Sequence, residues 1–125
     1  MSKSAQDFLS EANSVVPSIA VEEALSLINS GKAVVIDVRD GKEIDQSGTV
    51  KNALRIPRGM IEFVADPTSS FYNDQISNDK EILVICGAGG MAALTGKTLM
   101  EMGYTNVHNI GGFSAWKDAG GPTED

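Results

Sequence analysis

Short apolar runs alternate along the chain with stretches in which apolar residues recur at helical spacing. Two continuous runs rich in β-branched residues, at 33–36 and 81–85, predict strands that are covered on both faces. Shorter apolar runs predict three further strands, at 18–19, 53–55 and 106–110. The sheet is therefore expected to contain five strands.

Helices are predicted between these strands. They comprise a helical extension within residues 1–16, a helix at 21–28, a brief polar helix at 40–46, and helices at 91–102 and from 113 onward. Gly31 and Gly103 are placed to end two of them. Because strands alternate with helices, the pattern indicates an α/β domain with a mainly parallel sheet flanked by helices.

The pattern is least informative between residues 59 and 80. Apolar residues at 60–64 fit one helical turn ahead of Pro67, and Phe71 with Tyr72 is expected to anchor a loop. No repeat or linker divides the 125 residues, so we expect one domain spanning 1–125.

Composition and charge exclude several classes of protein. No apolar run approaches the roughly 20 residues of a membrane span, so we expect no membrane association. The N-terminus carries acidic residues where a signal peptide needs an apolar core, which predicts a cytoplasmic location. With 17 acidic and 10 basic residues the net charge is −7, and no basic run is present. Nucleic acid is therefore not an expected partner.

Cys86 is the strongest candidate for chemistry. As the single cysteine it excludes an internal disulfide and a multi-cysteine metal site, and no metal or cofactor is expected. It follows a predicted strand and precedes the glycine-rich turn 87–90 and a helix. Such a turn can direct several backbone N–H groups at one point, and the helix dipole adds positive charge there, which favours a thiolate. A buried structural cysteine is the alternative interpretation.

Two other motifs are weaker. Residues 96–98 resemble the end of a phosphate-binding P-loop, but that motif requires glycine where Met91 stands and a position at a helix N-terminus, so a nucleotide site is rejected. His108 is the single histidine and a candidate general base. Its place inside a short predicted strand favours a half-exposed structural residue instead.

Asp37, Arg39 and Asp40 follow the second predicted strand. Because ligands of parallel sheets bind at the carboxyl ends of strands, these side chains are candidates to support the site. A structural ion pair or a helix cap is the alternative for the same residues.

Four segments, taken in order, resemble the rhodanese-like (sulfurtransferase) domain. They are residues 35–40, residues 48–57 with Thr49 and Asn52 at positions where histidine and glycine are usual, the loop 86–90, and an ending formed by Gly111, Gly112, Trp116 and residues 120–122. The resemblance covers nearly the whole chain and implies a single rhodanese-like α/β domain with a five-stranded, mainly parallel sheet.

The resemblance also implies a reaction. Cys86 would attack the sulfane sulfur of a small donor such as thiosulfate, become a persulfide, and pass that sulfur to a thiol acceptor or a partner protein. The loop residues would bind the donor and cradle the persulfide with their backbone amides. These residues are Gly87, Ala88, Gly89, Gly90, Met91 and Ala92.

The loop departs from the family pattern C-x-x-G-x-R-[ST] at two positions. Met91 stands in place of the arginine, and Ala92 in place of the hydroxyl residue. Loss of one charge-assisted hydrogen bond costs about 1.5–3 kcal/mol, roughly tenfold to a hundredfold in donor affinity. We therefore expect thiosulfate to be a poor donor and a neutral persulfide or partner protein a better one, unless Arg58 or Arg55 supplies the missing charge.

Two alternatives to an active sulfurtransferase follow from this departure. A catalytically degenerate module could bind a partner through residues 59–80 or carry sulfur without turning over small donors; Met91 favours this function, and the retained Cys86 disfavours it. A cysteine phosphatase or arsenate reductase of the related fold would need a longer loop that ends in arginine. A persulfide-forming sulfurtransferase is the preferred hypothesis.

Overall fold

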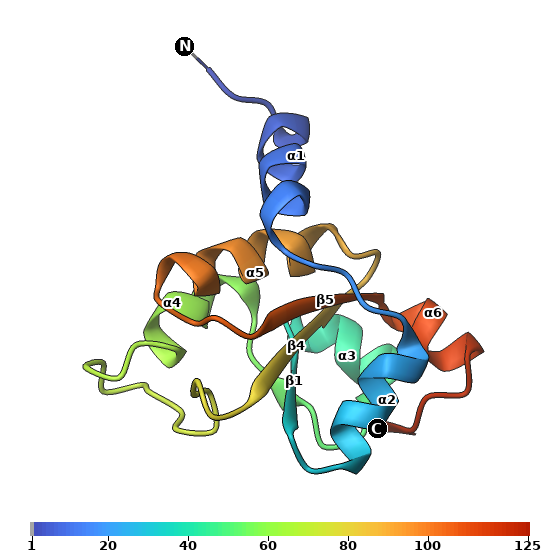
Figure 1. Ribbon diagram of the computed structural model, residues 1–125. Helices are drawn as coiled ribbons and strands as arrows, with labels where there is room; N and C mark the ends of the chain where they lie inside the picture. Colours follow the sequence, from blue (N-terminus) through green and yellow to red (C-terminus); the bar gives the residue numbers. More distant parts are fainter. Residues whose placement is uncertain (1) are drawn as a thin grey trace.

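The computed structural model describes residues 2–125, and its centre is a parallel sheet (Figure 1). The strands of this sheet lie in the order β3 (Leu54–Arg55), β1 (Ala33–Asp37), β4 (Glu81–Cys86) and β5 (Val107–Gly112). Each pair of neighbours is parallel. The predicted fold class, an α/β domain with a mainly parallel sheet, is confirmed.

Four of the five predicted strands form this sheet, and the one expected at 18–19 is reduced to a single bridge. Ser18 pairs in parallel with Asn109, flanked by hydrogen bonds from Ile19 N to Asn109 O (3.1 Å) and from Asn109 N to Pro17 O (2.8 Å). Pro17 has no N–H to extend the ladder, and the chain enters a helix at Val21. A small antiparallel sheet of β2 (Thr49–Val50) and β6 (Thr123–Glu124), which the pattern did not predict, stands apart.

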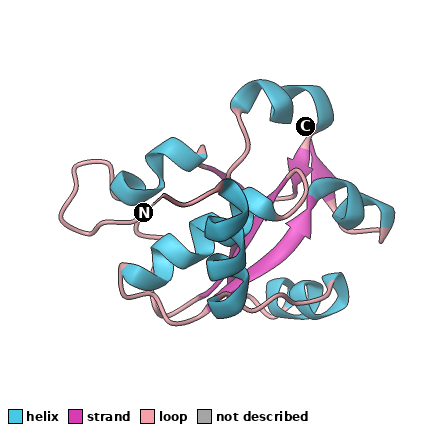
Figure 2. Cartoon of the chain, turned by 90° about the horizontal axis from the view of Figure 1, so that it is seen from above, coloured by secondary structure: helices cyan, strands magenta, loops and turns pink. Residues whose placement is uncertain are grey.

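Helices cover both faces of the sheet (Figure 2). They are α1 (Ala5–Val15), α2 (Val21–Asn29), α3 (Gly41–Ser47), the 3₁₀ turn η1 (Arg58–Met60), α4 (Ile61–Val64), α5 (Gly90–Glu101) and α6 (Phe113–Asp118). The predicted helices within 1–16, at 21–28, 40–46 and 91–102, and from 113 onward are all present, as is the turn at 60–64. None of the helices within residues 2–125 is both long and apolar enough to traverse a lipid bilayer.

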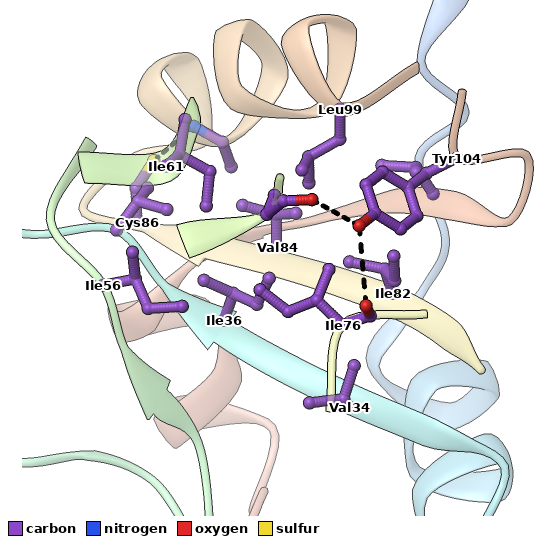
Figure 3. Close-up of a cluster of buried hydrophobic side chains, with 14 residues drawn as sticks. Val34, Ile36, Ile56, Ile61, Ile76, Ile82, Val84, Cys86, Leu99 and Tyr104 are labelled. Carbon is purple, nitrogen blue, oxygen red and sulfur yellow. Dashed lines mark hydrogen bonds between the residues drawn. The ribbon is translucent and has the colours of Figure 1, made fainter. Parts of the chain in front are cut away.

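Alternate residues of the central strands enter two separate cores. Ile36 and Val84 pack with Ile61 and Leu99 beneath α4 and α5 (Figure 3), whereas Leu83 packs on the opposite face with residues of α2 and α6. This alternation follows from the period of two along a strand. Because both faces are apolar, polar chemistry is left to the strand ends.

The segment between α4 and β4 is held by two buried anchors. Ile76 is fully buried, and the Tyr104 hydroxyl donates its proton to the carbonyl oxygen of Ala65, with that of Ile76 a more distant acceptor at 3.5 Å. Burial raises the pKa of Tyr104 above its ordinary value, which keeps the hydroxyl protonated as a donor. Tyr72 also donates to the Ile76 carbonyl (2.8 Å). Phe71, the other predicted anchor, is exposed and packs edge to face with the exposed Phe63.

Helix α1 projects from one edge of the domain and packs against α5 (Figure 1). A capping box starts it: Asp7 N donates to Ser4 Oγ (3.1 Å) and Ser4 N donates to Asp7 Oδ2 (2.9 Å). The contact with α5 is close, since a Cβ added to Gly96 would lie 2.8 Å from Cγ1 of Val16. The helical extension predicted within 1–16 is thus present, and its C-terminal end packs closely on α5.

Candidate active site

Cys86 ends β4, and its sulfur lies against the first turn of α5. The Sγ atom accepts hydrogen bonds from Gly89 N (3.0 Å) and Ala92 N (3.3 Å), and the side chain is 2% exposed. Two backbone N–H groups at the N-terminus of a 12-residue helix therefore surround the thiol. This arrangement is suited to hold negative charge on sulfur, as the glycine-rich sequence predicted.

The loop from residue 86 to residue 92, called the Cys86 loop below, depends on glycine for its shape. Gly89 adopts φ +96°, in the left-handed region that favours glycine. A Cβ added to Gly112, at the end of β5, would overlap the carbonyl oxygen of Gly87. The loop thus lies directly on the backbone of the neighbouring strand, and a side chain at Gly112 would displace it.

Asn109 fastens the Cys86 loop to β5, a role that sequence reasoning missed. Its side chain is nearly buried; Nδ2 donates to Gly89 O (3.0 Å), and Oδ1 accepts from Gly111 N (2.8 Å). Because the N–H of Gly89 donates to Sγ, Asn109 acts on the sulfur through one intervening residue. The available signal was an asparagine inside the predicted strand 106–110, two positions before Gly111.

Asp37 and Arg39 form a buried ion pair, and neither is a hydrogen-bond donor to Cys86. Arg39 Nη2 lies 2.8 Å from Asp37 Oδ2, and the two side chains are 3% and 0% exposed. Thr49 Oγ1 donates to the same carboxylate oxygen (2.7 Å), and Arg39 Nη1 donates to Ser47 Oγ (2.9 Å). Of the two alternatives for Asp37 and Arg39, the geometry shows the structural ion pair and not a hydrogen bond to the Cys86 sulfur. We call Asp37, Arg39, Ser47 and Thr49 the Asp37–Arg39 cluster.

Asp40 caps the helix that follows this cluster. It is the N-cap of α3, where its carboxylate accepts from Lys42 N at 3.2 Å. One turn on, Glu43 lies between the two regions: its Oε2 is 3.8 Å from Arg39 Nη1 and would lie 3.5 Å from a Cβ added to Gly87. The charged side chain that adjoins the Cys86 loop on this side is thus an acid.

The two candidate replacement cations lie in different places. Arg58 lines a groove with Gly90 and Met91, where Nη2 donates to Thr98 Oγ1 (3.1 Å) and Nη1 lies 3.4 Å from Glu62. Arg55 instead donates to the carbonyl oxygen of Asp125 (2.7 Å). Arg58 is therefore the cation beside the loop, and it is already engaged; its role in donor binding stays a prediction.

His108 lies on β5 away from the thiol. It is in register with Leu83, three residues before Cys86, and its Nε2 is 2.9 Å from Glu81 Oε1. Its side chain is 19% exposed and bonded to Glu81, so His108 is a partly buried strand residue, the interpretation that the sequence favoured over a general base. Among residues 2–125, no three His, Cys, Asp or Glu side chains are grouped to hold a metal ion.

Comparison with known proteins finds relatives that are named as sulfurtransferases. Adenylyltransferase and sulfurtransferase UBA4 of Candida albicans is 34% identical over 91 residues, which cover 72% of this chain but only 20% of that protein. Thiosulfate sulfurtransferase GlpE of Coxiella burnetii is 30% identical over 104 residues, which cover 82% of this chain and 88% of that protein.

The fold comparison extends over almost the whole chain. The structure of RPA3614 from Rhodopseudomonas palustris, a protein of unknown function and possible tyrosine phosphatase, has a TM-score of 0.90 at 37% identity and covers 99% of this chain and 96% of that one. The family model described as "Rhodanese-like domain" matches residues 20–119. Because that match includes most of the sequence together with Cys86 and its loop, the chain belongs to the rhodanese-like domain family.

Proposed function

We propose that this protein is a sulfurtransferase that moves sulfane sulfur through a persulfide on Cys86. The observation that carries the proposal is the pair of backbone N–H groups, from Gly89 and Ala92, that point at Sγ. Donors fixed in this way stabilise negative charge without having to reorganise during the reaction. Two of the named relatives, UBA4 and GlpE, are sulfurtransferases, which supports the same reaction class here.

The reaction consists of two displacements at sulfur. The Cys86 thiolate attacks the outer sulfur of the donor, a bond forms between Sγ and that sulfur, and the donor's S–S bond breaks with its electron pair leaving on the departing group. That group is sulfite for thiosulfate and a thiolate for a persulfide. An acceptor thiolate then attacks the outer sulfur of the persulfide, and Cys86 leaves as a thiolate. Neither step requires a separate general base.

The electrostatics favour a neutral persulfide over thiosulfate as donor. Met91 supplies no cation at the position where the family has arginine, Glu43 adjoins Gly87, and the net charge of the chain is −7. A dianion approaching Sγ therefore meets backbone donors but an unfavourable surrounding charge. The proposed partners are a small sulfur donor and a thiol acceptor, which includes a thiol on a partner protein. An unpaired reactive cysteine suits a reducing compartment, so the cytoplasm is the proposed location.

A non-catalytic sulfur carrier or binding module is the second candidate. It is favoured by the small exposed fraction of Cys86, 2%, together with Met91. Phosphatase chemistry has less support, because the Cys86 loop has no arginine to pair with a phosphoryl group. The carrier and the enzyme differ in whether Cys86 accepts sulfur from a small donor and releases it again.

Intact-mass measurement of the full chain tests the proposal. The purified protein is incubated separately with thiosulfate and with glutathione persulfide, freed of donor, and weighed before and after addition of a thiol acceptor. We expect a gain of one sulfur atom, larger with the persulfide, that the acceptor removes. Cys86→Ser is expected to abolish the gain completely while its thermal unfolding shows that it remains folded. No gain with either donor, from a protein whose thiol still alkylates, would contradict the proposal and favour the carrier or binding module.

A further inference from the structure

A groove of about 570 Å³ lies between α1 and α5, beside the Cys86 loop. Its apolar lining comes from both helices: Ala5, Phe8 and Leu9 of α1, and Met91 and Leu94 of α5. Phe8 and Met91 are 49% and 37% exposed, so large apolar side chains face solvent within it. Its volume lies within the roughly 300–1,000 Å³ typical of sites for small molecules.

The groove is continuous with the loop that holds the reacting sulfur. Gly90 and Met91 line it, and they stand between Gly89 and Ala92, the two donors to Sγ. Leu9 packs over the loop, since a Cβ added to Gly90 would lie 3.5 Å from its Cδ2. A molecule in the groove would therefore be in contact with the loop that receives the sulfane sulfur.

One wall of the groove lies outside the family domain. The rhodanese-like match begins at residue 20, whereas α1 ends at Val15. Helix α1 thus adds an apolar surface beside the Cys86 loop, in which Met91 stands where the family has arginine. The added helix and the Met91 side chain both line the same groove. A side chain that would bind an anion is replaced by one that contacts hydrocarbon.

The cations that line the groove are paired with acids of the same chain. Arg58 lies 3.4 Å from Glu62, and Lys97 Nζ lies 3.0 Å from Glu101. With these charges balanced, the groove complements an uncharged ligand better than an anion.

We propose that this groove binds the uncharged, apolar organic group of a persulfide donor, R–S–SH, while its outer sulfur reaches Cys86. The inference rests on the proposed function and names its substrate class. A bond forms between Sγ and the outer sulfur, the S–S bond of the donor breaks, and the electron pair leaves on R–S⁻. The proton stays on the transferred sulfur, so the products are the Cys86 persulfide and the thiolate of the donor.

The kinetic test compares two donors and two phenylalanine variants of the full chain. The initial rate of Cys86 persulfide formation is followed by intact mass with benzyl persulfide and with glutathione persulfide. Phe8→Ala is expected to lower the rate with subsaturating benzyl persulfide about fivefold and to leave the rate with glutathione persulfide within twofold. Phe71→Ala is the matched control, because Phe71 is also exposed but does not line the groove, and it should change neither rate. Equal effects of Phe8→Ala on both donors would overturn the inference.

A binding measurement separates the groove from the chemistry. The Cys86→Ser variant is titrated with benzyl methyl sulfide, an unreactive thioether, and amide chemical shifts are followed by NMR. We expect chemical-shift changes at Leu9, Met91 and Leu94. The dissociation constant obtained from them should rise about fivefold when Phe8 is also replaced by alanine. Absence of these shifts overturns the inference even if Cys86 forms a persulfide, and shifts without persulfide formation by the wild type overturn the proposed function instead.

A second copy of the chain is the competing occupant of the groove. Sedimentation of the wild type and of Phe8→Ala at equal concentrations distinguishes it. Equal masses for the two proteins are expected. A dimer that Phe8→Ala converts to a monomer would show that the groove is filled by another copy, and it would overturn the inference.

Discussion

The Asp37–Arg39 cluster and the Cys86 loop lie at the ends of neighbouring parallel strands, β1 and β4, yet they differ in the groups that surround a negative charge. In the cluster, an ion pair 2.8 Å long is buried and surrounded by hydrogen-bonding side chains. In the loop, the sulfur meets two backbone N–H groups and no charged side chain among its hydrogen-bond donors within residues 2–125.

The two regions have different roles, because the cluster connects segments of the fold whereas the loop positions hydrogen-bond donors at Sγ. Arg39 joins the end of β1 to the Ser47 hydroxyl and the Gly48 carbonyl, and its guanidinium lies 4.6 Å from the Phe113 ring. Its contacts thus connect the end of β1 with the end of α3 and with α6. The donors at Sγ are instead backbone N–H groups of the loop. A change of side chain at Met91 therefore alters the surroundings of the sulfur but leaves these two donors in place.

Removing one partner of the buried pair is expected to have the largest effect. Arg39→Met leaves the Asp37 carboxylate buried without its cation and should lower the free energy of unfolding by about 3–5 kcal/mol, measured by urea denaturation. The double variant Asp37→Asn with Arg39→Met should recover part of that loss, because the unpaired charge is gone. A loss below about 1 kcal/mol in Arg39→Met would show that the cluster does not hold the fold.

Supplying the missing cation at the loop is expected to have the next largest effect. Met91→Arg should raise kcat/KM for thiosulfate tenfold to a hundredfold, because it adds a charge-assisted hydrogen bond to an anionic donor. Met91→Leu, which keeps an apolar side chain, is the matched control and should leave thiosulfate turnover unchanged. If Met91→Arg folds and shows no gain, Arg58 already supplies the charge, and the contrast between the two regions is smaller than it looks.

Much of the fold was predictable because its main strands are local apolar runs. The runs at 33–36 and 81–85 become β1 and β4, and the residues after the second run identify Cys86 and its glycine turn. The pairing of β2 with β6 was not predictable, because Thr49 meets Glu124 across most of the chain and each strand has two residues. Contacts of that kind leave no local periodicity.

The less readable parts of the site depend on partners that are remote in sequence. Ile76 is buried, and Tyr104 reaches the same segment from beyond α5. Within residues 59–80 the sequence could therefore indicate the anchor Tyr72 but not the contact with Tyr104. For Asp37 and Arg39 the sequence left two alternatives open, because their burial depends on Thr49 and Ser47. Asn109 was overlooked since its acceptor, the Gly89 carbonyl, is 20 residues away.

Asn109 tests whether the loop needs its side-chain fastening. Asn109→Ala removes the hydrogen bonds to Gly89 O and from Gly111 N, so the amides at Sγ lose their fixed position, and kcat for sulfur transfer should fall about tenfold with KM little changed. Simple destabilisation would leave kcat per folded molecule unchanged. Asn109→Asp keeps the acceptor for Gly111 N but cannot donate to Gly89 O. Its kcat should therefore be no higher than intermediate between those of the wild type and Asn109→Ala. A kcat equal to that of the wild type would show that Asn109 is not a positioning residue.

The smallest expected effect lies where the two regions meet. Glu43 is half-exposed, 3.8 Å from Arg39 Nη1 and adjacent to Gly87, so its charge is felt weakly by both the cluster and an incoming donor. Glu43→Gln should raise kcat/KM for thiosulfate about twofold. It should change the free energy of unfolding by less than about 0.5 kcal/mol, because the Glu43 carboxylate is exposed to solvent and lies 3.8 Å from its partner. Glu23→Gln makes the same charge change on the exposed face of α2 and should raise neither quantity. A similar gain in both variants would mean that net charge, and not the carboxylate beside the loop, disfavours the anionic donor.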